Sequence, residues 1–125
     1  MPRFVILEHD HPHLHWDLML ETGTVLRTWR LAEPPEPGKT VAAEPLGEHR
    51  LTYLDYEGPV SGNRGQVRRW EFGTYDDETP SVEKTTASMT LVLHGRRLRG
   101  RCTLTSSPEG TWSFCLAPET KSSVS

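Results

Sequence analysis

Residues 14–21 read Leu14-His15-Trp16-Asp17-Leu18-Met19-Leu20-Glu21, and their alternation predicts a β-strand. Apolar side chains occupy every even position and therefore share one face, because successive residues of a strand point to opposite sides of a sheet. That face is suited to a hydrophobic core. The other face presents His15 and Asp17 two residues apart, which is close enough for both side chains to hold one ion.

The same alternation recurs along the chain, and no stretch longer than about ten residues has the 3.6-residue apolar period of a helix. We therefore expect an all-β, mainly antiparallel fold, a compact eight-stranded β-barrel with long surface loops; a two-sheet sandwich is the alternative. Glycine-containing hairpin turns are expected at Glu21–Thr24 and His94–Arg97. The expected strands run from Phe4 to His9, His15 to Glu21, Thr24 to Leu31, Leu51 to Glu57, Gln66 to Phe72, Ala87 to His94, Leu98 to Thr105 and Thr111 to Ala117.

Two segments lack the alternation and are expected to cross the surface as loops. Ala32 to Glu44 carries three prolines and a glycine, and Thr74 to Thr86 carries an acidic run followed by Pro80. Proline cannot donate a hydrogen bond to a central strand. A chain of 125 residues fits one domain, which we expect to span residues 1–120, with 121–125 as a flexible tail.

Charge and composition exclude some classes of protein. The formal net charge of −3 argues against wholesale electrostatic binding of a polyanion, although a local basic face remains compatible with it. The sequence lacks the run of about eighteen apolar residues that spans a bilayer and the basic and apolar regions of a signal peptide. Two cysteines, Cys102 and Cys115, are too few for a disulfide scaffold. We expect a soluble cytoplasmic protein without membrane contact.

Four of the six histidines fall within the run His9-Asp10-His11-Pro12-His13-Leu14-His15-Trp16-Asp17. Pro12 favours a turn that can bring His9, at the end of one strand, beside His15, at the start of the next. Together with Asp17 they would form a set of two histidines and one carboxylate, which leaves positions open for water and substrate. His11 and His13 lie in the turn, and we do not expect them to be metal ligands.

Two sequence patterns, one of which includes this segment, indicate a resemblance to a known family. His9 to Glu21 fits His-Asp-x-x-x-x-His-x-Asp-x-x-Leu-Glu after an apolar strand, and Glu48 to Gly58 fits Glu-His-x-x-x-Tyr-x-Asp-x-Glu-Gly. In this order and spacing the chain resembles the 3′-phosphoesterase domain of bacterial DNA ligase D and its free-standing relatives. Matching positions extend over most of the chain.

The resemblance implies a β-barrel with a crescent-shaped site that removes 3′-phosphates and 3′-terminal ribonucleosides from DNA ends. It implies a divalent metal, typically manganese, held by the positions of His9, His15 and Asp17. It also implies that His49 and Tyr53 hold the scissile phosphate. By its donor types alone, the metal set accepts zinc or iron as well.

The chain departs from the family pattern at two cations. Met19 stands where the family has an arginine two residues after the metal-binding aspartate, and Glu33 stands where it has a lysine. An arginine can grip a phosphate with two parallel hydrogen bonds, which an uncharged side chain cannot do. We expect metal binding to survive these changes and phosphoesterase activity to be at risk.

These observations leave three functional interpretations. The first is a metal-dependent 3′-phosphodiesterase and phosphomonoesterase for DNA repair, acting as a monomer on DNA 3′ ends such as primer–templates. The second is a catalytically weakened or inactive module that keeps the fold and the metal site and binds DNA ends or assists a separate DNA ligase. The third, a small-molecule hydrolase or isomerase on a cupin-type barrel, does not explain Glu48 to Gly58.

A further basic segment has two alternative interpretations. Arg96, Arg97, Arg99 and Arg101 crowd the hairpin around Gly95. They would either contact a nucleic-acid backbone or form a solvated strand face.

Overall fold

The alternating segment that begins at His15 is the second of nine strands in the computed structural model, which describes residues 1–80 and 88–118. One single-turn 3₁₀ helix accompanies the strands in this part of the chain. In chain order the elements are β1 (Arg3–His9), β2 (His15–Thr22), β3 (Val25–Leu31), β4 (Thr40–Arg50), η1 (Leu51–Leu54), β5 (Gly58–Pro59), β6 (Gln66–Asp77), β7 (Ser88–His94), β8 (Arg99–Ser106) and β9 (Trp112–Leu116).

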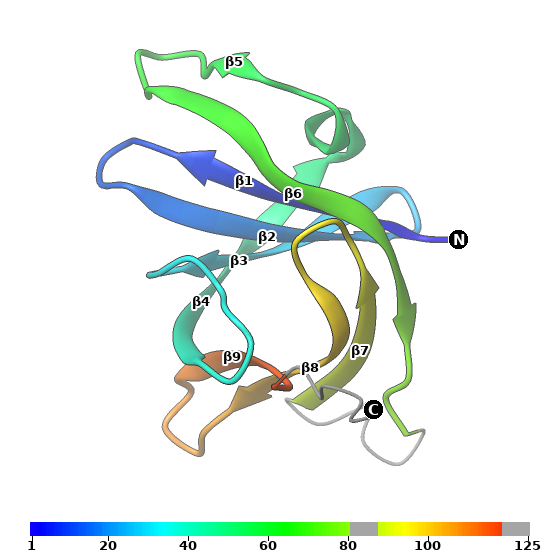
Figure 1. Ribbon diagram of the computed structural model, residues 1–125. Coiled ribbons are helices and arrows are strands. Elements are labelled where there is room, and N and C mark those ends of the chain that lie inside the picture. Colours follow the sequence, from blue (N-terminus) through cyan, green and yellow to red (C-terminus); the bar gives the residue numbers. More distant parts are fainter. Residues whose placement is uncertain (81–87, 119–125) are drawn as a thin grey trace.

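The strands form a closed ring. Their order is β1-β2-β3-β4-β9-β8-β7-β6, and β6 pairs back onto β1, so eight strands complete the circle (Figure 1). Every ladder between neighbouring strands is antiparallel, and the two-residue β5 adds to the start of β6. The predicted all-β, antiparallel fold with eight strands is confirmed.

Two hydrophobic clusters cover the two faces of β1 and β2. The larger cluster fills the ring and receives side chains from all eight of its strands, including Phe4, Ile6 and Leu18, which are completely buried. The smaller cluster lies on the outer face, where Leu7 and Met19 pack beneath η1 and β6. β1 and β2 are therefore buried on both faces, between the two clusters.

One predicted strand and one predicted loop are wrong. The strand expected at Leu51 to Glu57 is instead η1 followed by irregular chain, and Thr40–Glu44, expected within a loop, belongs to β4. In β4 the alternation that faces the core is carried by Val41 and Ala43. The small side chains here give only a weak period-two pattern, and the prolines just before them favour a loop. Those three prolines lie outside β4.

The boundary after β6 also differs from the prediction. Residues 74–77 continue β6 and pair with β7, although we expected a loop from Thr74. Leu14, expected on the core face of its strand, precedes β2 and is 54% exposed. The rest of the predicted loop, from residue 81, and the predicted tail lie outside the described residues. No helix in the described ranges is long and apolar enough to cross a membrane.

Candidate metal centre

The β1–β2 hairpin brings three potential ligands together. In its antiparallel register His9 lies opposite His15, and Leu7 lies opposite Asp17, so both histidines and the aspartate project from the same outer face. One ligand atom from each residue can be chosen so that all three lie within 4.8 Å of one another. The structure thus assembles the set expected from the histidine run, with its members held on adjacent buried strands.

Backbone carbonyls fix which nitrogen of each histidine faces inward. His9 Nε2 donates a hydrogen bond to the carbonyl oxygen of Arg64 at 2.8 Å, and His15 Nδ1 donates to that of His13 at 2.7 Å. The other ring nitrogens, His9 Nδ1 and His15 Nε2, lie 3.7 and 3.3 Å from Asp17 Oδ2. This is the arrangement of metal-binding histidines, in which a hydrogen bond to the outer nitrogen orients the lone pair of the inner one.

The buried carboxylate of Asp17 favours a cation at this site. Asp17 is 5% exposed, and its Oδ1 atom is buried without a hydrogen-bond partner among the described residues. Burial lowers the pKa of His15, but the hydrogen bond and charge of Asp17 outweigh burial, so that this pKa is raised. The buried carboxylate therefore favours a positive charge beside it. A divalent ion would supply that charge, and two imidazoles with one carboxylate fit manganese, iron or zinc.

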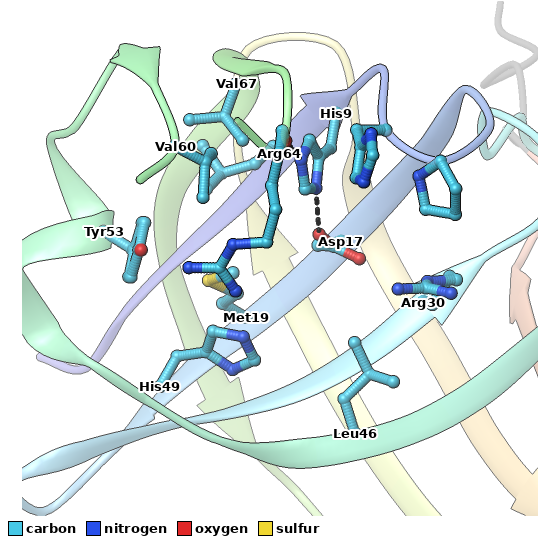
Figure 2. A pocket seen from close by; sticks show the side chains of 13 residues that line it. His9, Asp17, Met19, Arg30, Leu46, His49, Tyr53, Val60, Arg64 and Val67 are labelled. Atoms are coloured by element: carbon cyan, nitrogen blue, oxygen red, sulfur yellow. Dashed lines mark hydrogen bonds and ion pairs between the residues drawn. The ribbon is translucent and has the colours of Figure 1, made fainter. Parts of the chain in front are cut away.

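His9 and Asp17 open onto a pocket of about 280 Å³ that also contains His49 and Tyr53 (Figure 2). His49 lies near the end of β4, and Tyr53 reaches the pocket from η1, not from a strand as we expected. Their rings meet edge to face with centroids 5.9 Å apart. The pocket therefore joins the metal-ligand set to both residues that were matched to phosphate binding.

His49 is oriented in the same way as the two candidate ligands. Its Nδ1 lies 2.9 Å from both the carbonyl oxygen of Gly47 and the hydroxyl of Thr28. Because the carbonyl can only accept, Nδ1 carries the proton, and Nε2 is left for a ligand in the pocket.

Comparison with known proteins decides the family. The model of the DNA ligase D 3′-phosphoesterase domain matches residues 7–106 of this chain. The chain belongs to this family. Multifunctional non-homologous end joining proteins named LigD are similar to it. The protein of Mycobacterium tuberculosis H37Rv is 32% identical over an alignment of 114 residues, which covers 87% of this chain and 15% of that protein. The LigD protein of Pseudomonas aeruginosa is 30% identical over an alignment of 107 residues, which covers 79% of this chain and 12% of that protein.

Met19 and Glu33, the two positions at which the resemblance implies a cation, have different surroundings. Met19 is 2% exposed and forms part of the pocket floor. Glu33 does not line the pocket and pairs with Lys39 at 2.7 Å on the surface. Only position 19 therefore bears directly on this pocket.

Two arginines that the sequence could offer only as possible replacements for the missing cations, Arg30 and Arg64, line the pocket. Arg30 lies opposite Asp17 in the β2–β3 ladder, a pairing that follows by counting outward from the turn at Gly23. The sequence thus contained a signal for Arg30. Arg64 reaches the pocket from a loop far along the chain, for which no local pattern exists.

The arginines of the β7–β8 hairpin lie outside this pocket. Arg97 stacks on Trp70 and Arg96 on Phe72, with guanidinium carbons 4.5 Å from the ring centroids, while Arg101 pairs with Glu78. These contacts tie the hairpin arginines to the protein surface itself.

Proposed function

We propose that this chain is a divalent-metal-dependent phosphoesterase that removes 3′-phosphates and 3′-terminal ribonucleosides from DNA ends during repair. The observation that carries the proposal is the shared pocket, in which His9 and Asp17 of the candidate ligand set lie with His49 and Tyr53. Membership of the DNA ligase D 3′-phosphoesterase family supports the substrate class. Manganese is the metal that we expect.

The protein's part in metal binding is to hold three donors in place before the ion arrives. A divalent metal held by His9, His15 and Asp17 would supply charge to neutralise a phosphoryl oxygen and a means to orient a water molecule. Asp17 supplies the only carboxylate of the set and stays shielded from solvent, which strengthens its attraction for a cation. The carbonyls of Arg64 and His13 keep the imidazoles turned toward it.

His49 and Tyr53 are proposed to stabilise charge on the phosphate. With its Nδ1 proton committed to Gly47, His49 has Nε2 left for the pocket, where an Nε2–H group can donate a hydrogen bond to a phosphoryl oxygen. The Tyr53 hydroxyl has no hydrogen-bond partner among the described residues and is free to donate a second bond. Donors aimed at developing charge in a partly closed site are an effective means of lowering a barrier.

Met19 favours a second candidate, a module that binds DNA ends but turns them over weakly. An apolar floor replaces the phosphate-gripping arginine implied by the family. The chain spans about 15% of the length of the LigD proteins it matches, so action together with a separate DNA ligase is also a proposal.

One experiment separates these candidates. A labelled primer–template with either a 3′-phosphate or a single 3′-ribonucleotide is incubated with the protein and manganese. We expect the protein to remove the terminal group, His15→Ala and Asp17→Ala to be inactive, and His13→Ala to remain active because only its backbone carbonyl is used. End binding without turnover at high enzyme concentration would favour the binding module.

A further inference from the structure

Arg30 and Arg64 place two guanidinium groups at the pocket, on either side of Asp17 (Figure 2). Within residues 1–80 and 88–118, neither forms an ion pair with an acidic side chain. By contrast, Arg68 and Arg101 on nearby strands are paired with glutamates. The two cations at the pocket are thus left available for an anion from outside the protein.

Arg30 is held beside the candidate metal ligands by the β2–β3 ladder. It is half-buried, and its Nε atom is buried without a hydrogen-bond partner among the described residues. An unsatisfied donor in a partly buried cation is unfavourable unless a ligand supplies the acceptor. The position of Arg30 opposite Asp17 places this side chain at the pocket.

Arg64 is held by the loop between β5 and β6. The Val60 amide donates to the Gly65 carbonyl at 2.8 Å, and the Gln66 amide donates to Asp10 Oδ1 at 2.8 Å, which fastens the loop to the β1–β2 turn. Arg64 Nε donates to the Ser61 carbonyl at 2.7 Å. Its Nη2 atom also donates to the Ser61 hydroxyl at 3.3 Å. These bonds fix the side chain so that its guanidinium lies above Met19 and near His49 (Figure 2).

We infer that Arg30 and Arg64 grip the terminal phosphate of the 3′ end and supply, from other positions, the cations absent at Met19 and Glu33. This inference rests on the proposed function. Guanidinium groups suit the task, because each offers two parallel N–H donors to a phosphate. Arg64 would approach from the side of His49, and Arg30 from the side of the metal ligands. A phosphate monoester carries up to two negative charges, which two arginines can balance.

The test measures binding without metal, so that it does not depend on turnover. Fluorescence anisotropy compares three labelled primer–templates in EDTA: one with a 3′-phosphate, one with a 3′-hydroxyl and one with the phosphate on the 5′ end instead. The proteins are the parent, Arg30→Gln, Arg64→Gln and Arg27→Gln. Arg27 is the matched control, since it lies on β3 but points to Trp29 and does not line the pocket.

We expect the parent to bind the 3′-phosphate end more tightly than both other ends. This ratio of affinities should fall about tenfold in each pocket variant and stay unchanged in Arg27→Gln. Equal binding of the 3′- and 5′-phosphates by the parent, or an unchanged preference in both pocket variants, would overturn the inference.

Turnover with manganese is then measured on the same proteins. Removal of the 3′-phosphate by the parent and equally by both pocket variants would overturn the role of the arginines and leave the proposed phosphoesterase intact. An arginine-dependent 3′-phosphate preference without turnover in the parent would support the arginines and count against the phosphoesterase.

Discussion

His9 donates a hydrogen bond from Nε2 to the backbone carbonyl of Arg64, a residue 55 positions further along the chain, at 2.8 Å. The same loop residue therefore orients a candidate metal ligand through its backbone and reaches the pocket with its side chain. Movement of this loop would disturb metal binding and phosphate binding together. The loop thus links the candidate metal ligands to the proposed phosphate-binding side chains, and substitutions in the loop can test both.

Gly65→Ala is expected to move this loop. Gly65 has a φ of +76°, and an added Cβ would meet the side chain of Asp10 and approach the His11 Cβ to 2.7 Å. We expect unfolding in urea to show a loss of about 2–4 kcal/mol, which combines left-handed strain with the clash, and manganese affinity to fall in calorimetry.

Gly110→Ala is the control for the strain alone. Gly110 also has a positive φ, +88°, but its added Cβ would meet nothing within 4 Å. This variant should lose only about 1–2 kcal/mol and keep the parent's manganese affinity. Equal effects of the two substitutions on metal affinity would show that the loop does not orient His9.

Asp17→Asn tests the metal centre with almost no change in shape. It removes the buried negative charge that faces both inner nitrogens, and we expect manganese affinity to fall at least about hundredfold, since even the partners behind metal ligands contribute about 10–100-fold. Manganese at about 100 times the parent's Kd should stabilise the parent by about 2.7 kcal/mol and this variant by no more than about 0.4 kcal/mol. His13→Ala, which keeps the backbone carbonyl, should behave like the parent. Unchanged metal affinity in Asp17→Asn would remove this residue from the ligand set.

The part of the site that could be predicted from the sequence is the part built by local pairing. His9, His15 and Asp17 belong to one hairpin, so strand parity and a proline turn were sufficient to bring them together. Tyr53 was assigned to a strand because a single 3₁₀ turn is too short to have a recognisable period. The position of Arg64 depends on the bond between Asp10 and Gln66, 56 residues apart, and such long-range contacts leave no local pattern.

Glu71 has a structural role that the sequence did not reveal. It is 1% exposed, and its carboxylate accepts hydrogen bonds from the backbone amides of Phe72, Arg96, Arg97 and Leu98 at 2.6–3.0 Å. In Glu71→Gln an amide group would face these donors, so we expect urea unfolding to show a loss of about 2–4 kcal/mol. Exposed Glu48, mutated to Gln, is the control. Manganese affinity should not change, because the hairpin lies outside the pocket; a stable Glu71→Gln protein would contradict the role.

The two cysteines should differ in reactivity. Burial raises the pKa of the Cys102 thiol to about 12, and Cys115 adds to the shift, so Cys102 stays protonated at pH 8. Because the thiolate is the reactive form, a disulfide reagent at pH 8 should modify only the partly exposed Cys115 in the folded protein, and both cysteines in guanidinium chloride. Cys115→Ser should remove the fast phase. Two fast thiols in the folded parent would contradict the burial of Cys102.

Met19→Arg in the Arg64→Gln background tests whether one arginine can replace the other. The two side chains lie one above the other in the pocket (Figure 2), so a guanidinium from position 19 can enter the space that Arg64 leaves. We expect the double variant to regain at least half of the lost 3′-phosphate preference on a logarithmic scale, measured by anisotropy in EDTA. Stability should fall by about 2–4 kcal/mol, because Met19 is 2% exposed and packed in the outer cluster. Met19→Leu in the same background conserves volume without adding charge and should restore nothing. A folded double variant that binds no better than Arg64→Gln would show that position 19 does not reach the phosphate.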